Sequence, residues 1–324
     1  MEENTEQRVD LTLFSEKIQE LKDRIASVIV GQEQTVDLVL TAILANGHVL
    51  IEGVPGVAKT LLARLTARLI DADFSRVQFT PDLMPSDVLG TTVFNMKTNA
   101  FDFHQGPIFA DIVLVDEINR APAKTQAALF EVMEERQVSI DGTTHRMGEL
   151  YTILATQNPV EQEGTYKLPE AQLDRFLMKI TMDYPSLEEE VNILERHHTN
   201  AALVKLEDVT PVLTKEELLS LRALMSRVFV DRTLLQYIAL IVQQTRTSKA
   251  VYLGASPRAS VAMLQSSKAY ALLQGRDFVT PEDIKFVAPY VLQHRLILTA
   301  EAEMEGYSPV KVTQRLIDKV EVPK

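Results

Sequence analysis

One segment of this 324-residue chain restricts its fold more than any other feature. An apolar run at residues 48–51 leads into Gly53-Val-Pro-Gly-Val-Ala-Lys59-Thr60, and helix-forming residues continue from there to Ile70. A strand, a glycine-containing loop and a helix in this order direct backbone N–H groups toward an anion at the helix N-terminus. The segment therefore predicts a phosphate-binding loop within an α/β domain.

The loop departs from the usual pattern at one position, where Ala58 replaces a glycine. A backbone N–H binds an anion whatever side chain it carries, so we expect an alanine to be tolerated if its φ is negative. We expect Gly56 to carry the harder conformational demand. Lys59 is expected to neutralise the β- and γ-phosphates, and Thr60 to bind Mg²⁺ through its hydroxyl.

The second part of the predicted site is a pair of carboxylates at the end of a strand. Residues 112–115 read Ile-Val-Leu-Val and end in Asp116 and Glu117. An uncharged run of this kind is typical of a strand buried on both faces of a parallel sheet. Phosphoryl transfer needs a carboxylate for Mg²⁺ and a group that orients or deprotonates water. We expect Asp116 to take the first role and Glu117 the second.

Hydrophobic periodicity divides the chain into two predicted domains. Residues 1–184 contain an entry helix, several apolar strands and two hairpins near 90–106 and 137–148. Residues 185–324 contain helix starts with good caps, among them the capping boxes that begin at Ser186 and Thr214. The sequence therefore predicts an α/β P-loop domain, with a parallel sheet flanked by helices, followed by a smaller all-α lid domain.

The composition narrows the possible functions. The absence of cysteine excludes disulfides, thiolate nucleophiles and cysteine-bound metals, and the six histidines show no metal-binding spacing. No run approaches the roughly 18 apolar residues of a membrane span, so we expect a cytoplasmic protein. A net charge of -12 disfavours nucleic acid as a partner. Residues 1–10 are polar and acidic and are expected to form a flexible tail.

Several motifs together resemble the MoxR family of AAA+ ATPases over nearly the whole chain. The first four are residues 53–60, Asp116-Glu-Ile-Asn-Arg-Ala-Pro122, Ala155-Thr-Gln-Asn-Pro159 and Leu173-Asp-Arg-Phe176. Gln78-Phe-Thr-Pro-Asp-Leu-Met-Pro-Ser-Asp87 and Gly254-Ala-Ser-Pro-Arg258 are further pieces of the same resemblance. Alanine at position 58 is similar to that family's own loop.

The resemblance implies roles for residues near the predicted site. Asn158 would be the sensor 1 residue beside the attacking water, and a strand-end cap is the alternative. Arg175 would be an arginine finger that reaches the γ-phosphate of the neighbouring subunit, and a surface pair with Asp174 is the alternative. Arg258 would be sensor 2, which contacts ATP from the lid, and an ordinary ion pair is the alternative. Because Arg258 lies in the first turn of a helix, where a cation is unfavourable, we also expect a compensating anion beside it.

The weaker parts of the resemblance are the linker and the hairpins. Gly31 and Gln32 resemble the segment whose backbone reads the adenine, and a plain helix stop is the alternative. The hairpins fall where AAA+ relatives carry insertions that face the ring pore, and purely structural hairpins are the alternative. The expected catalytic residues are Lys59, Asp116, Glu117, Asn158 and Arg175; the expected nucleotide contacts are Gly31, Gln32, Gly53, Val54, Pro55, Gly56, Val57, Ala58, Lys59, Thr60, Leu61 and Arg258; the expected metal ligands are Thr60 and Asp116.

The function implied by the resemblance is Mg²⁺-dependent ATP hydrolysis in a homo-oligomeric ring, expected to be a hexamer. Its energy would drive chaperone-like remodelling or maturation of partner proteins, which in this family commonly bear von Willebrand factor A domains. A nucleic-acid-dependent motor and a binding module without significant hydrolysis are the alternatives. The acidic charge argues against the first, and intact Glu117, Asn158 and Arg175 argue against the second.

Overall fold

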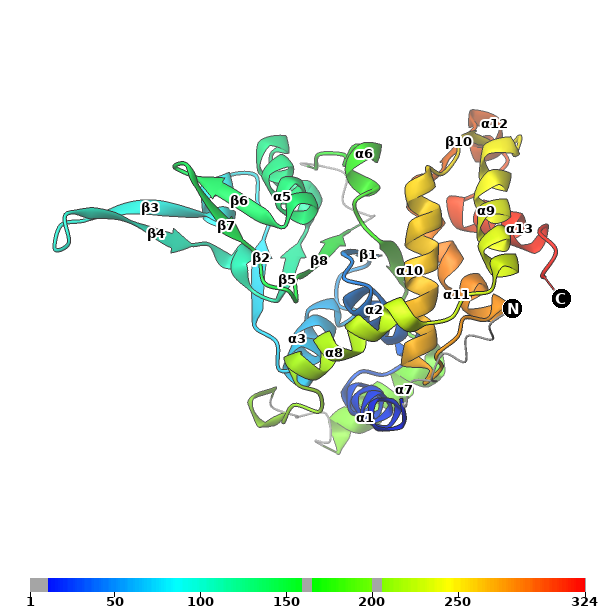
Figure 1. The fold of residues 1–324 in the computed structure, drawn as a ribbon, viewed down its shortest axis with the longest axis horizontal. Coiled ribbons are helices and arrows are strands. Elements are labelled where there is room, and N and C mark those ends of the chain that lie inside the picture. The colour runs from blue at the N-terminus through cyan, green and yellow to red at the C-terminus, as the bar shows by residue number, and fades with distance from the viewer. Residues whose placement is uncertain (1–10, 159–164, 200–205, 324) are drawn as a thin grey trace, which may run out of the picture.

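A parallel β-sheet forms the centre of the computed structural model, which describes residues 11–158, 165–199 and 206–323. The sheet has five strands in the order β2-β5-β8-β1-β9, and each pairs in parallel with its neighbours (Figure 1). The predicted parallel sheet is confirmed. Its strands are β1 (Val49–Gly53), β2 (Phe74–Gln78), β5 (Ile112–Asp116), β8 (Thr152–Gln157) and β9 (Met178–Met182).

Helices cover both faces of the sheet, which explains the uncharged run in β5. Ile112 and Leu114 join a core that includes α2 (Glu33–Leu44), α3 (Lys59–Leu69) and helices of the C-terminal part. Val113 and Val115 point the other way, into a second core with α5 (Ala123–Glu135). Alternate residues of a strand face opposite sides, so a strand covered on both sides needs apolar residues throughout.

Shorter elements complete the N-terminal part. The predicted entry helix is present as α1 (Thr12–Val28), which buries Ile18, Leu21 and Ile25. At Ser186 the predicted capping box begins α7 (Leu187–His198), where the Ser186 hydroxyl accepts from the N–H of Glu189. Two short helices, α4 (Pro85–Leu89) and α6 (Glu170–Leu173), precede it in the chain.

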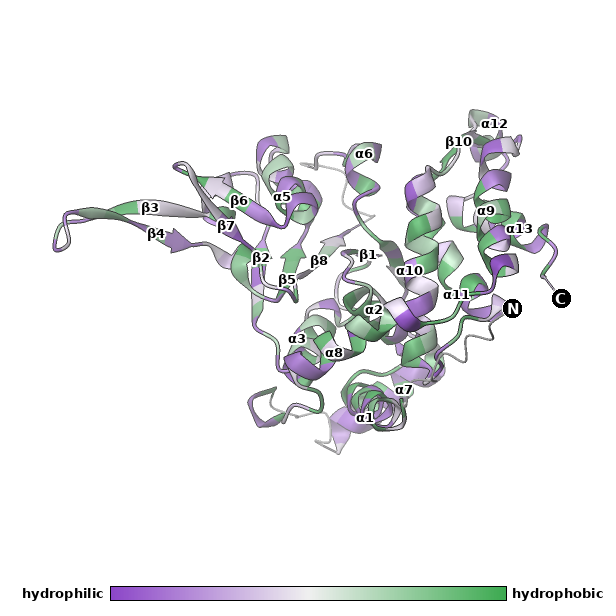
Figure 2. Cartoon of the chain, in the orientation of Figure 1, coloured by the Kyte–Doolittle hydropathy of each residue, from purple (hydrophilic) through white to green (hydrophobic). Residues whose placement is uncertain are grey.

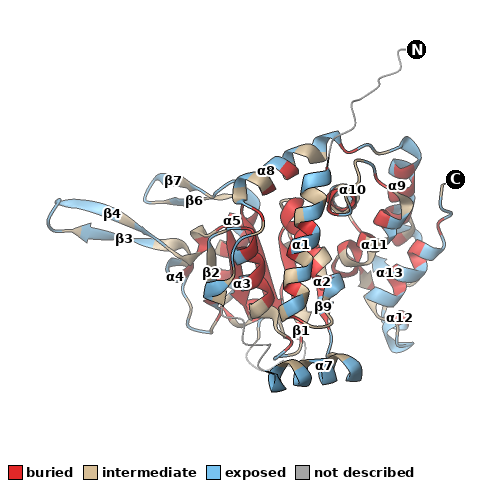
Figure 3. Ribbon diagram, turned by 90° about the horizontal axis from the view of Figure 1, so that it is seen from below, coloured by how far each residue is buried: buried red, intermediate tan, exposed pale blue. Residues whose placement is uncertain are grey.

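Two antiparallel hairpins project from one side of the sheet, away from the C-terminal helices (Figure 1). Their strands are β3 (Gly90–Asn95), β4 (Ala100–Gln105), β6 (Gln137–Ile140) and β7 (Thr143–Arg146), as the sequence predicts. Most of their surface is exposed, whereas the sheet and the helices beside it are buried (Figure 3). The hairpins touch through the rings of Phe103 and His145, whose centres lie 4.2 Å apart.

The C-terminal part is a bundle of helices with apolar faces turned inward (Figure 2). It contains α9 (Arg232–Thr247), α10 (Pro257–Leu273), α11 (Pro281–Leu292), α12 (Ala300–Met304) and α13 (Pro309–Asp318), whereas α8 (Lys215–Leu224), which precedes them in the chain, packs on α2. α10 packs on α2, and α11 packs on β9. A short antiparallel pair, β10 (Val251–Leu253) with β11 (Ile297–Leu298), is the exception to its helical character.

Two expectations fall on residues outside the described ranges. These are the flexible tail at residues 1–10 and Pro159, the last residue of the motif at 155–159. The domain boundary expected at residue 184 falls between β9 and α7 and stays a prediction. No helix in the described part of the chain is long and apolar enough to cross a membrane.

Candidate nucleotide site

The phosphate loop and the predicted carboxylates meet at one edge of the sheet. Gly53 ends β1, Asp116 ends β5 and Asn158 follows β8, which lies between those two strands. In a parallel sheet the carboxyl ends of all strands share an edge, and ligands of open α/β sheets bind in the crevice there. The topology therefore brings these three predicted residues together.

The loop reaches the helix through two left-handed residues. Gly56 has φ +88° and Ala58 has φ +62°. The expectation of a negative φ at Ala58 is wrong: this residue precedes α3 in the left-handed region, which costs an alanine about 1–2 kcal/mol. Gly53 is required for another reason, because a Cβ there would lie 2.7 Å from the carbonyl oxygen of Met182. Strain of this kind is typical of functional loops.

Lys59 begins α3 and lies close to both carboxylates. Its Nζ donates to the carbonyl oxygen of Gly53 at 2.5 Å. Partial burial lowers the pKa of Lys59, while the nearby charges of Asp116 and Glu117 act in the opposite direction. The amine is therefore surrounded by the groups that a bound triphosphate and its metal would contact. Thr60 is the next residue of the same first turn.

Asp116 is buried and both of its oxygens have partners. Oδ2 accepts from Nε of Arg76 at 2.6 Å, and Oδ1 accepts from the hydroxyl of Thr156 at 3.0 Å. Arg76 stands on β2, directly beside Asp116's strand, because the register pairs Gln78 with Asp116. The side chain of Arg76 is half exposed. The Arg76 guanidinium thus binds Oδ2 of Asp116, the residue predicted to bind Mg²⁺.

Glu117 is held in a strained position. Its φ of +56° is left-handed, which is uncommon for a residue other than glycine, asparagine or aspartate. The backbone N–H of Glu117 donates to Thr156 Oγ1 at 3.0 Å, and its Oε2 accepts from Nε2 of Gln78 at 2.8 Å. Arg120 Nε lies 3.1 Å from the same oxygen. The carboxylate is therefore drawn toward β2.

A cavity of about 260 Å³ adjoins the phosphate loop. Its walls are the segment around Gln32, residues 56–58 of the loop with Leu61, and the side of α7 that carries Ile193 and His197. The mixed apolar and polar lining suits a planar base next to a triphosphate site. Gly31 packs against the first turn of α7, since a Cβ there would clash with the carboxylate of Glu189.

Arg196 fixes α7 against this cavity. Its Nη1 donates to the carbonyl oxygens of Ala26 and Ser27, which end α1, at 3.0 and 2.7 Å. A cation is favourable at a helix C-terminus, where carbonyl groups lack partners. The sequence predicts the start of α7 but not its place beside the nucleotide loop.

Arg175 and Arg258 lie at the opposite edge of the sheet from the loop. Arg175 precedes β9, which runs parallel to β1, and a cavity there is lined by both arginines together with residues 45–48, which precede β1. The five residues of β1 at about 3.3 Å each separate the two edges by about 16 Å. A lid contact within one subunit requires Arg258 beside the phosphate loop of its own chain. The structure does not bring Arg258 there.

Both arginines pair with Glu134 of α5. Glu134 Oε2 accepts from Nε of Arg175 at 2.7 Å, and Oε1 accepts from Nη2 of Arg258 at 2.6 Å. Glu134 is thus the compensating anion expected for Arg258. Asp174 does not pair with Arg175, because it accepts from Nε of Arg295 at 2.6 Å instead.

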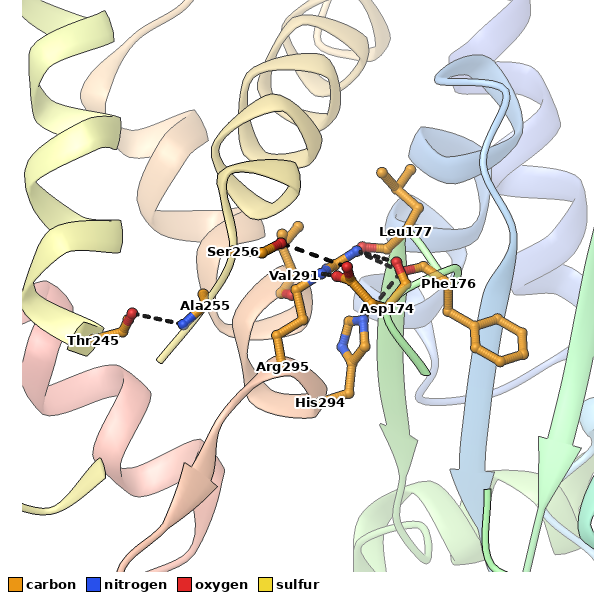
Figure 4. Close-up of polar contacts among 9 residues, drawn as sticks. All are labelled: Asp174, Phe176, Leu177, Thr245, Ala255, Ser256, Val291, His294 and Arg295. Carbon is orange, nitrogen blue, oxygen red and sulfur yellow. Dashed lines mark hydrogen bonds and ion pairs between the residues drawn. The ribbon is translucent and has the colours of Figure 1, made fainter. Parts of the chain in front are cut away.

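Arg295 ties the helical bundle to the segment that carries Arg175. Its side chain is 4% exposed and donates to the carbonyl oxygens of Phe176 and Leu177 as well as to Asp174 (Figure 4). His294 also reaches the Phe176 oxygen, with Nε2 at 3.1 Å. Burial is the main cause that lowers the pKa of His294 well below its usual range, so the ring is neutral.

The residues present fit magnesium held mainly by a nucleotide. The described residues contain no group of three or more histidines, aspartates or glutamates that could hold a metal by themselves. Mg²⁺ usually takes one or two protein oxygens and completes its shell with phosphate and water. The Thr60 hydroxyl and the Asp116 carboxylate, at the same edge, are such oxygens. The chain's own residues thus supply what an Mg²⁺–nucleotide complex needs.

Fold and site together define a P-loop ATPase, and comparisons with known proteins agree. A model of the ATPase family associated with various cellular activities (AAA) matches residues 48–178, and one of the AAA lid domain matches residues 243–318. Chaperone MoxR1 of Mycobacterium tuberculosis is 45% identical over 93% of this chain and 81% of its own length. The chain belongs to the MoxR family of AAA+ ATPases. Protein MoxR of Methylorubrum extorquens is 31% identical over 91% of both chains.

A solved structure supports the same fold. The crystal structure of a Cytophaga hutchinsonii protein superposes with a TM-score of 0.89, at 41% identity over 97% of both chains. The α/β domain with its helical lid and ATPase activity follow from these relationships. Four polar residues around the two edges, Arg76, Gln78, Glu134 and Arg196, were not expected to take part. Gln78 begins a motif of the resemblance that assigned it no role, and no sequence signal separates the other three from surface side chains.

Proposed function

We propose that this protein binds ATP with Mg²⁺ and hydrolyses it between the subunits of a ring, and that hydrolysis drives the remodelling of partner proteins. One observation carries the proposal. Lys59, Asp116 and Glu117 converge at one edge of the sheet, while the arginines expected to complete the site stand at the other. A single subunit therefore holds two complementary halves of a phosphoryl-transfer site.

The chain's own groups divide the work at the loop. Backbone N–H groups of residues 53–60 and the Lys59 amine bind the phosphates, and Thr60 and Asp116 hold the metal. Bound Mg²⁺ would neutralise charge on the β- and γ-phosphates. Glu117 accepts the proton of the attacking water, and Asn158, at the end of the adjacent strand, orients that water.

The ring rests on the position of Arg175. Because about 16 Å separates its edge from the loop of its own chain, it serves a phosphate only on a neighbouring copy. Such head-to-tail contacts close into a ring when the rotation from one copy to the next closes. A second feature supports the same contact: α7, which walls the base cavity, exposes Leu187, Val191 and Leu194 along one face (Figure 3). A neighbour covering the nucleotide would bury this face. We propose six subunits, as the resemblance implies.

The hairpins suit a protein partner better than nucleic acid. Met96 and Phe101 are 89% and 72% exposed on the β3–β4 hairpin, where Phe94 also reaches the surface. The hairpin at 90–106 contains one lysine, Lys97, and the hairpin at 137–148 contains one arginine, Arg146. An apolar tip on an acidic chain favours contact with protein, and we propose a cytoplasmic partner, with a von Willebrand factor A domain as the first candidate.

The test is ATP binding and turnover in three variants, with and without Mg²⁺. Lys59→Ala should weaken ATP binding about 100-fold, because it removes the main cation on the phosphates. Glu117→Gln should bind Mg²⁺-ATP like wild type and lose turnover about 100-fold or more, because it loses the base. Lys285→Ala, at an exposed lid lysine, is the control. Affinity within a few-fold of wild type in a folded Lys59→Ala protein would falsify the site.

The same assay addresses the nucleic-acid motor. With few cations on the hairpins, DNA should change the hydrolysis rate less than about twofold at physiological salt. A salt-sensitive increase of about tenfold or more would contradict the proposed remodelling function.

A further inference from the structure

A single carboxylate joins the two arginines at the far edge of the sheet. Glu134 lies in the last turn of α5 and gives one oxygen to Arg175 and the other to Arg258. These hydrogen bonds, that from Arg258 foremost, lower the pKa of Glu134, so its carboxylate is ionised at neutral pH. Two cations that would repel each other are therefore held at one anion. Arg175 and Arg258 lie 41 and 124 positions beyond Glu134 in the sequence.

The way Glu134 holds Arg175 leaves the outer end of this arginine available. The bond uses Nε, and neither Nη atom of Arg175 has a hydrogen-bond partner among the described residues. The centre of the guanidinium lies 5.9 Å from the centre of the Phe130 ring, which limits its tilt. Arginine binds phosphate through paired N–H groups. Glu134 thus fixes the inner nitrogen while two outer donors remain for an anion.

The backbone at Arg175 is fixed separately. Arg295 binds the residues on both sides of it, as described above, so the main chain of this segment moves with the lid (Figure 4). Breaking a buried guanidinium away from its acceptors is costly. The direction of the Arg175 side chain is then the remaining freedom, and the contact with Glu134 sets it.

We propose that Glu134 is a positioning residue that aims Arg175 at the nucleotide of the adjoining subunit and couples that aim to Arg258 on the lid. The inference rests on the proposed function, in which Arg175 acts across a subunit boundary. Glu134 does not touch the nucleotide itself. One carboxylate between two arginines leaves a surplus positive charge, which suits a phosphate. A shift of the lid moves Arg258, and through the shared carboxylate it moves Arg175.

Two matched variants test this role. Glu134→Gln removes the charge and keeps the shape of the side chain. Glu135→Gln removes the same charge at the next position, where the exposed side chain has no hydrogen bond or ion pair in the described part of the chain. We expect Glu134→Gln to lower kcat about tenfold, to keep the KM for ATP within about threefold and to melt like Glu135→Gln. Wild-type kcat in Glu134→Gln would overturn the proposal.

Mixed rings separate a positioning role from a merely structural one. A Glu117→Gln subunit keeps a complete arginine edge, so mixing it with Arg175→Ala restores activity if Arg175 acts on its neighbour. Mixing it with Glu134→Gln should restore activity equally, because the Glu134→Gln subunit keeps its own base. Mixing Glu134→Gln with Arg175→Ala should give no rate above that of Glu134→Gln alone, because neither subunit presents a complete arginine edge. Native mass spectrometry shows that each mixture forms mixed rings.

The outcomes distinguish the two levels of the proposal. No rescue in mixed rings of Arg175→Ala with Glu117→Gln overturns the shared site and the role of Glu134 with it. Rescue there but none between Glu134→Gln and Glu117→Gln overturns the role of Glu134 alone. The double variant Glu134→Gln/Arg175→Ala should turn over no more slowly than Arg175→Ala, because Glu134 acts through Arg175. An additive loss would also count against the proposal.

Discussion

Arg76 holds the oxygen of Asp116 that the proposed mechanism needs for magnesium, with Nε 2.6 Å from Oδ2. The Thr156 hydroxyl donates to the other oxygen, so Mg²⁺ would compete with the guanidinium for Asp116. We therefore expect Arg76→Ala to lower the Mg²⁺ concentration for half-maximal ATP binding by about fivefold, the equivalent of about 1 kcal/mol for a partly exposed ion pair.

A Mg²⁺ titration of ATP binding measures this shift. Arg232→Ala, which removes an exposed arginine of the lid, should leave the titration unchanged. If Arg76→Ala raises the Mg²⁺ requirement, the guanidinium supports the metal site instead of competing with the metal.

Gln78 restrains the second carboxylate. Its amide donates to Glu117 Oε2 at 2.8 Å, an oxygen that also lies 3.1 Å from Arg120 Nε. Releasing this bond frees Glu117 to meet water, so Gln78→Ala should raise the basal kcat about threefold and leave ATP affinity unchanged. Steady-state turnover and calorimetry measure the two quantities. Gln78→Ala/Glu117→Gln must stay inactive, and a fall in kcat of Gln78→Ala would show that Gln78 orients the base productively.

The apolar strands and the loop are readable from the sequence because local patterns determine them. Residues 112–115 are uncharged since both faces are covered, and the capping boxes at Ser186 and Thr214 have the predicted geometry. β9 was not predicted. Its sequence Met-Lys-Ile-Thr-Met alternates, and its lysine, Lys179, pairs with Glu52 at 2.8 Å on the neighbouring strand.

The arrangement around the site depends on contacts between distant residues. Nothing local predicts that Arg258 meets Glu134, 124 positions away, or that Arg76 meets Asp116. The left-handed φ of Ala58 was also missed, because an alanine is ordinarily more stable with a negative φ and only the surrounding loop imposes the other value. The sequence thus indicates which residues could form the site, while the edge on which each arginine lies cannot be read from it.

His48 makes the fold sensitive to acid. It is buried, its Nδ1 accepts from the N–H of Ile153, and its Nε2 donates to the carbonyl oxygen of Met133. Burial foremost, with the nearby charge of Arg136, lowers its pKa from 6.5 to about 3. Between pH 6.5 and about pH 3, His48 is therefore protonated in the unfolded chain and neutral in the folded chain. This contribution to stability is complete above pH 6.5 and is lost as the pH falls toward 3.

Denaturant unfolding at a series of pH values tests this role of His48. From pH 6.5 downward, wild type should lose up to about 1.4 kcal/mol per pH unit through this one proton. His48→Gln should be less stable at neutral pH but lose stability less steeply in acid. His198→Gln, at an exposed histidine, should follow wild type. Equal acid slopes for His48→Gln and wild type would show that His48 does not carry the effect.

Whether an active site needs two subunits is decided by the ATPase rate per subunit as a function of protein concentration, with assembly followed in parallel by mass photometry. Because Arg175 stands at the edge of the sheet about 16 Å from the edge that carries the loop of its own chain, we predict that the rate per subunit falls with dilution as the rings dissociate. Arg175→Ala should stay about a thousandfold slower at every concentration. A constant wild-type rate per subunit, persisting where the protein is monomeric, would contradict hydrolysis between subunits.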